Sequence, residues 1–215
     1  LRTGGYDRYD RDYHLRKLAE LYEEVGQREK AIATLKKVLS LKNSPDVNIL
    51  NKLGHLYGDT GNLKAQERMY REAGKVSWCG TPMFNLALAQ RDRGHTNDAL
   101  KSVETALEKK QSAPYKVLKG MLLQKGGRQA EAKEALKEAM AGFDSIQVQD
   151  EWELGWYQTA AKMLDQDKKA SEAERELKKR KKEKTRVRSN DSVQDGLLPI
   201  LLREAESEET NSAAA

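Results

Sequence analysis

Glycine recurs at a nearly constant interval along this chain. Gly26, Gly61, Gly94 and Gly127 are separated by 35, 33 and 33 residues. Each glycine has a small residue seven positions before it and a large apolar residue nine positions after it. A period of this length is typical of stacked helical units, in which each unit buries its apolar face against the next. The spacing therefore predicts an array of repeats.

Each glycine stands between two amphipathic patterns. Before Gly26, apolar and small residues at Leu15, Leu18, Ala19 and Tyr22 follow the i, i+3, i+4, i+7 spacing of one helix face. Glycine ends such a helix because it enters the left-handed region at little cost. The stripe of the second helix follows, and it consists of Ala31, Ile32, Leu35, Val38 and Leu39.

The small residues predict close packing between the two helices of a unit. Gly54 and Gly120 occupy the same column as Ala19, where a larger side chain would hold the partner helix away. Pro45 and Pro82 stand at unit boundaries, where proline fits the first turn of a following helix. Each unit is therefore expected to be a tight helix pair.

The order of these residues resembles that of the tetratricopeptide repeat family. The second unit matches best, with Leu50, Leu53, Gly54, Tyr57, Gly61, Tyr70 and Ala73. The resemblance covers four units over residues 12–141 and implies an all-α fold, a right-handed superhelix of antiparallel helix pairs. Gln66, Lys119, Gln90 and Leu123 depart from the pattern, the last two replacing an aromatic residue.

Four regions are predicted. Residues 1–11 form an N-terminal flank and residues 12–141 form the four repeat pairs. Residues 142–184 form a degenerate fifth pair with a capping helix, in which Asp165 stands near the place of the glycine. Residues 185–215 form a basic-to-acidic tail that we expect to be largely disordered. The opening residues include neither a methionine nor an apolar signal core, so we expect an upstream part outside this sequence.

Motifs for catalysis are missing. The glycines are too far apart for a phosphate loop, and His14, His55 and His95 have no carboxylate or thiol at metal-ligand spacing. Cys79 is the only cysteine and has no histidine base near it in sequence. We therefore expect no enzymatic activity, no cofactor and no metal. The expected location is the cytoplasm, since no targeting signal is visible in the sequence. No run approaches the length of a membrane span.

The resemblance implies that the first helices of successive pairs line a concave groove, which binds a partner protein or peptide. Asparagine side chains both donate and accept, so they suit the backbone of an extended peptide, while apolar residues suit its side chains. An alternative is that the apolar residues pack onto the fifth pair or the tail. The candidate residues are Arg16, Lys17, Glu20, Asn48, Asn51, Lys52, His55, Phe84, Asn85, Leu88, Arg91, Val117, Leu118 and Met121.

Further alternatives concern the C-terminal part. The segment 178–188 has eight basic residues and one acid, so it suits nucleic acid or an anionic surface, or it is a solvated helix end. The apolar segment 197–202 is a candidate helix for self-association or for docking in the chain's own groove. The predicted function is thus a scaffold or adaptor, with nucleic-acid binding or regulation of a larger protein as alternatives.

Overall fold

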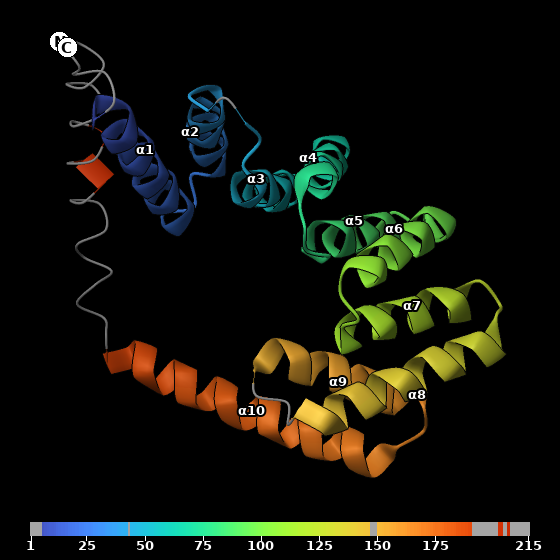
Figure 1. Cartoon of the computed structure of the whole chain (residues 1–215). Helices are drawn as coiled ribbons and strands as arrows, with labels where there is room; N and C mark the ends of the chain where they lie inside the picture. Colours follow the sequence, from blue (N-terminus) through green and yellow to red (C-terminus); the bar gives the residue numbers. More distant parts are fainter. Residues whose placement is uncertain (1–5, 43, 147–149, 191–201, 204–205, 207–215) are drawn as a thin grey trace. The chain divides into compact units, whose positions relative to one another are not determined.

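The computed structural model describes residues 6–42, 44–146, 150–190, 202–203 and 206, and within these ranges it contains helices and no strand (Figure 1). The long helices pair in chain order, α1 with α2, α3 with α4, α5 with α6, and α7 with α8. Their bounds are α1 Tyr6–Glu24, α2 Arg28–Ser40, α3 Val47–Asp59, α4 Leu63–Val76, α5 Thr81–Asp92, α6 Thr96–Lys109, α7 Ala113–Lys125, α8 Gln129–Ile146, α9 Glu151–Met163 and α10 Asp167–Asn190.

The turns inside the pairs share one geometry, and it confirms the role predicted for the glycines. At the first turn the Gly26 amide donates to the carbonyl of Glu23, and the Gln27 amide donates to that of Tyr22 at 2.7 Å. These two bonds form a Schellman motif, which needs a left-handed residue after the helix. The fifth turn is built in the same way with Asp165 at φ 55°. The glycines have φ of 77°, 76°, 80° and 78° at Gly26, Gly61, Gly94 and Gly127.

The column of small residues allows the close approach that the sequence predicts. A methyl group added at Gly54 would lie 2.4 Å from the ring of Tyr70 on α4. At Gly120 it would lie 2.7 Å from Leu136 on α8. The two helices of these pairs therefore pack with a large side chain of one against the bare backbone of the other.

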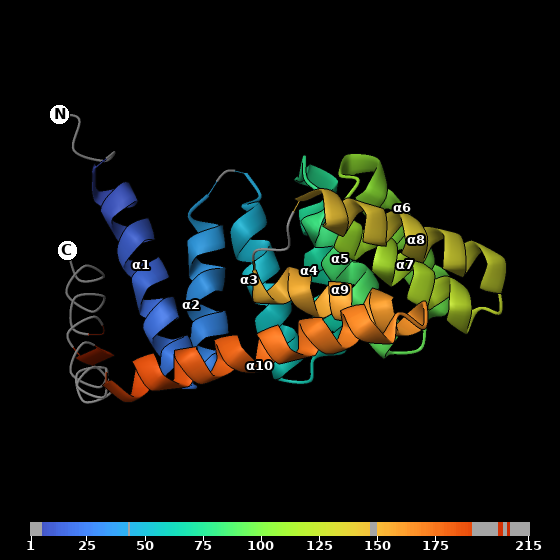
Figure 2. The same cartoon turned by 90° about the horizontal axis from the view of Figure 1, so that it is seen from below.

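The chain divides into two compact units, residues 1–76 with 190–215, and residues 77–189. In unit 1, a hydrophobic cluster joins α1, α2 and α3 and includes the buried Leu18, Leu35 and Leu53. Figure 2 shows α1, α2 and α3 side by side. In unit 2, one cluster centres on α5, α6 and α7, and a second joins α7 and α8 to α9 and α10.

The helices extend beyond the predicted region boundaries. The first helix begins at Tyr6, inside the predicted flank, and α8 continues to Ile146. The last helix, α10, continues to Asn190, past the boundary predicted at residue 184. Ion pairs at the i, i+4 spacing, Glu174 with Lys178 and Glu176 with Arg180, support this charged helix where its apolar stripe ends.

Candidate functional site

A cleft of about 170 Å³ in unit 1 brings together several of the predicted groove residues. Buried Leu35 of α2 and Ile49 of α3 supply its apolar surface. Helices α1 and α3 each bury their apolar face in the cluster of unit 1, so their polar side chains lie around these two residues. These polar lining residues are Arg16 and Glu20 of α1 and Asn48 and Lys52 of α3.

An ion-pair network centred on Asp46 fixes one wall of the cleft. Arg16 donates to Asp46 at 2.9 Å and to Asp12 at 3.0 Å, and Lys42 donates to Asp46 at 2.8 Å. The same carboxylate caps α3 by accepting from the Ile49 amide at 3.1 Å. Burial favours the neutral form of Asp46, but hydrogen bonds from Lys42 and Arg16 outweigh it and hold the pKa of Asp46 well below its usual range.

The other charged groups near the cleft are also paired. Lys52 lies 3.0 Å from Glu23, and Lys17 lies 2.9 Å from Glu20. The lining therefore presents balanced charge rather than a basic patch. Asn48 is exposed, so its side-chain amide is accessible from the cleft.

Three predicted residues of unit 1 do not line the cleft. Lys17 and His55 are exposed, and the His55 ring packs edge to face against Tyr70 at 5.5 Å. Asn51 is partly buried, and its Oδ1 accepts no hydrogen bond among the residues that the structure describes.

In unit 2 the structure differs from the expected groove at three positions. Phe84, Val117 and Leu118 are 2%, 0% and 0% exposed, so they belong to the core and offer no pocket to a partner. The Phe84 ring stacks on Tyr115 at 4.5 Å and meets Trp156 of α9 edge to face at 5.5 Å. The alternative interpretation, packing against the fifth helix pair, is thus observed for Phe84.

The remaining candidates in unit 2 are half-buried. Leu88 and Met121 pack against different hydrophobic clusters, and Trp156 contacts both clusters. Asn85 and Arg91 are half-buried on α5, on whose surface Leu88 also lies.

Trp152 of α9 was not among the predicted site residues. This side chain is 51% exposed, and its ring meets Phe84 at 5.9 Å and Trp156 at 6.2 Å. The unusual density of aromatic residues at the start of the fifth pair was the available signal. Trp152 is therefore exposed apolar surface beside Phe84 and Trp156.

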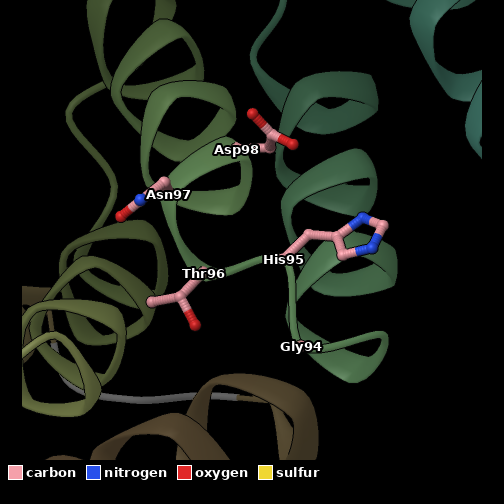
Figure 3. A pocket seen from close by; sticks show the side chains of 5 residues that line it. All are labelled: Gly94, His95, Thr96, Asn97 and Asp98. Atoms are coloured by element: carbon pink, nitrogen blue, oxygen red, sulfur yellow. The ribbon is translucent and has the colours of Figure 1, made fainter.

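A second hollow lies at the turn between α5 and α6 and has no features of a site. It is lined by Gly94, His95, Thr96, Asn97 and Asp98 from a single loop and the helix start. Figure 3 shows that the side chains of His95, Asn97 and Asp98 point in different directions. With no convergent polar groups, this hollow does not resemble a ligand pocket.

Three lysines of the basic run, Lys179, Lys181 and Lys182, are exposed on α10. Others are paired, including Lys184, which donates to Glu151 at 2.7 Å. Binding of nucleic acid by this run stays a prediction. None of the helices in the described ranges is long and apolar enough to cross a bilayer.

Trp78 and Cys79 lie at the start of unit 2. The Trp78 side chain is 91% exposed, whereas Cys79 is partly buried with its sulfur 3.2 Å from the Ser77 hydroxyl. The described residues contain no group of three His, Cys, Asp or Glu side chains arranged as metal ligands.

Comparisons with known proteins agree with the repeat geometry. Models of the tetratricopeptide repeat match residues 15–48, 47–75 and 113–141. A comparison with curated proteins gives no significant match.

Solved structures with a similar fold include the crystal structure of MamA, which has 19% identity and a TM-score of 0.56 and matches over 79% of this chain and 96% of its own. A structure of MamA from Desulfovibrio magneticus RS-1, covering residue 41 to the end, has 16% identity and a TM-score of 0.57. It matches over 79% of this chain and 93% of its own. The crystal structure of BtubC from P. vanneervenii has 20% identity and a TM-score of 0.58, and it matches over 75% of this chain and 76% of its own. At this identity the likeness shows the fold alone. The repeat-model matches show that the chain carries tetratricopeptide repeats, and the recurring turn geometry agrees with them.

Proposed function

We propose that this chain is a protein-interaction scaffold that binds an extended segment of a partner protein in the cleft lined by α1, α2 and α3. The observation that carries the proposal is the composition of the cleft, in which apolar Leu35 and Ile49 lie among polar Arg16, Glu20, Asn48 and Lys52. Apolar surface with a few polar groups around it is the usual composition of a site that takes a side chain and orients a backbone. The family supports the same role.

The charges near the cleft narrow the class of partner. Arg16 and Lys52 already lie beside Asp46 and Glu23, and Glu20 lies beside Lys17. A polyanionic partner would have to compete with these carboxylates for each cation, at a cost in desolvation. We therefore propose a segment of low net charge, with an apolar side chain on Leu35 and Ile49.

Asn48 is suited to hold the backbone of such a segment. Its side-chain amide has two donors and an acceptor, so it can pair with both groups of one peptide unit. The Asn48 backbone amide is already used, since it donates to Asp46 at 3.1 Å and so fixes the residue at the start of α3. The side chain is thus presented from a rigid element, which lowers the entropy cost of binding.

Unit 2 contributes a separate apolar contact in this proposal. Trp152 is 51% exposed, and half-buried Leu88 and Met121 pack on the two hydrophobic clusters that Trp156 also contacts. Exposed tryptophan beside half-buried aliphatic side chains is typical of interaction hot spots. We propose that apolar side chains of a partner bind here.

The test uses the full chain as bait for a displayed library of random peptides. Selected peptides are then measured by titration against Asn48→Arg, which fills the cleft from its rim, and Asn97→Arg, a matched change at the hollow beside α6. We expect at least a tenfold loss of affinity for Asn48→Arg and none for Asn97→Arg, with unchanged helical circular dichroism for both. Peptides that bind all three chains equally would contradict the proposed cleft.

A further inference from the structure

The described C-terminal residues pack against the first helix pair within unit 1. Leu202 is buried and joins the hydrophobic cluster of α1, α2 and α3. The Tyr22 hydroxyl donates to Glu206 Oε1 at 2.7 Å, and Lys30 Nζ lies 3.3 Å from the same oxygen. Figure 1 shows the short red ribbon of segment 202–203 beside α1. The contact thus combines apolar burial, a hydrogen bond and an ion pair.

Comparison with the second repeat shows which position this segment takes. Tyr57 is the equivalent of Tyr22, and it is covered by α2 of the preceding pair, with Lys36 Nζ 5.5 Å from its ring centre. The two tyrosines are equally buried, at 6% for Tyr22 and 7% for Tyr57. Because α1 is the first helix that the structure describes, the C-terminal segment supplies the cover that a preceding helix supplies elsewhere.

We propose that the edge of the first pair is a binding surface for an acidic amphipathic helix, and that the chain's own segment carrying Leu202 and Glu206 occupies it. We name this edge, formed by Tyr22 and Lys30, the docking surface. Leu202 packs on the cluster of α1, α2 and α3 while Glu206 contacts Tyr22 and Lys30, so the leucine and the carboxylate reach the surface together. Lys30 Nζ lies 5.1 Å from the Tyr22 ring centre and beside Glu206, so the surface favours a carboxylate.

The docking surface is distinct from the cleft proposed above. Neither Tyr22 nor Lys30 lines that cleft. The apolar segment 197–202 was expected to dock in the chain's own groove, whereas Glu206 pairs with Lys30 outside the cleft. Residues 197–201 lie outside the described part of the chain. The contact therefore shields a second interaction surface instead of blocking the first.

Tethering gives this arrangement a regulatory consequence. A segment on the same chain as its site acts at an effective concentration on the order of millimolar. A separate acidic helix with leucine and glutamate four residues apart must compete against that concentration. Access to the docking surface is consequently controlled by release of the tail.

Cross-linking tests whether the segment docks on its own chain. In full-length protein with Cys79→Ser, the pair Lys30→Cys and Glu206→Cys is treated with a short bismaleimide at low micromolar protein. We expect cross-linked monomer in a yield independent of concentration. The control pair is Lys64→Cys with Glu206→Cys, because Lys64 is exposed on α4 and, within the described residues, forms no ion pair with Glu206. Equal yields for the two pairs, or a cross-linked dimer, would overturn docking in cis.

Charge reversal tests the recognition itself, with a labelled peptide of residues 197–210 as the probe. Glu206→Lys places like charges together and should release the tail, so the peptide should bind at least tenfold more tightly than to the wild-type chain. Adding Lys30→Glu to that variant should abolish peptide binding and restore hydrogen-exchange protection near Tyr22. Glu131→Lys is the control for the same charge change elsewhere. Equal peptide affinity for the wild-type chain and Glu206→Lys would refute the proposal.

Discussion

Ser102 of α6 donates a hydrogen bond of 2.7 Å to the side-chain oxygen of Gln90 on α5, and both residues are buried. Gln90 holds the position that Tyr22 and Tyr57 hold in the first two repeats. The third repeat has thus replaced an aromatic contact with a polar pair. A buried acceptor of this kind is tolerated only while its donor is present.

Ser102→Ala should lower the free energy of unfolding by about 1–3 kcal/mol because it leaves the Gln90 oxygen buried without a partner. The double variant Gln90→Leu with Ser102→Ala should recover most of that loss, since neither polar group remains. Urea unfolding followed by circular dichroism measures both. Additive losses in the double variant would show that the two residues do not act as a pair.

Asp165→Gly should stabilise the protein by about 0.5–1 kcal/mol. Asp165 has φ 55°, in the region where a side chain is strained and glycine is not. Asp167→Gly is the control, because Asp167 is the first residue of α10 and glycine should not stabilise a helix there. Thermal unfolding of both variants gives the comparison. A lower melting temperature for Asp165→Gly would contradict the assigned role of the turn.

Gly54→Ala should destabilise unit 1 by about 1–3 kcal/mol, as overpacked cores do. The added methyl would lie 2.4 Å from the Tyr70 ring, so α3 and α4 must separate. Gly155→Ala is the matched control. Nothing lies within 4 Å of a methyl added there, so the gain in helix propensity should stabilise α9 by about 0.5–1 kcal/mol. The midpoints of denaturant unfolding should shift in opposite directions for the two variants.

The stability of unit 1 should fall in acid through Asp46. Its folded pKa lies below the ordinary value, so its contribution is complete above about pH 4 and is lost as the pH falls further. Asp46→Asn should flatten the acid limb of a stability–pH profile, because it removes this titrating carboxylate. Asp46→Ala should also cost about 1 kcal/mol at neutral pH from loss of the helix cap.

The repeat architecture could be predicted because its determinants are local. A left-handed glycine and a small residue seven positions before it specify a turn and a close helix contact within one unit. The fifth turn has no glycine. There Asp165 adopts the left-handed backbone conformation that glycine adopts in the other four turns. The helix end at Asn190 was harder, because ion pairs such as Glu176 with Arg180 continue α10 beyond its apolar stripe.

The candidate site could be predicted only in part. Arg16, Asn48 and Lys52 line the cleft because their position on a helix face follows from the repeat. Phe84, Val117 and Leu118 have equivalent positions but are covered by later elements, which a pattern within one unit does not encode. Trp152 was missed because the fifth pair departs from the pattern that supplied the candidates.

The nearly complete exposure of Trp78 gives the chain a built-in optical reporter. The sequence has three tryptophans, and the other two, Trp152 and Trp156, belong to the aromatic surface of α9. An indole in water emits at longer wavelength and is quenched more readily by iodide than one packed among rings. Trp78→Phe would therefore leave an emission spectrum that comes from α9 alone, so that occupation of that surface becomes visible without any attached dye.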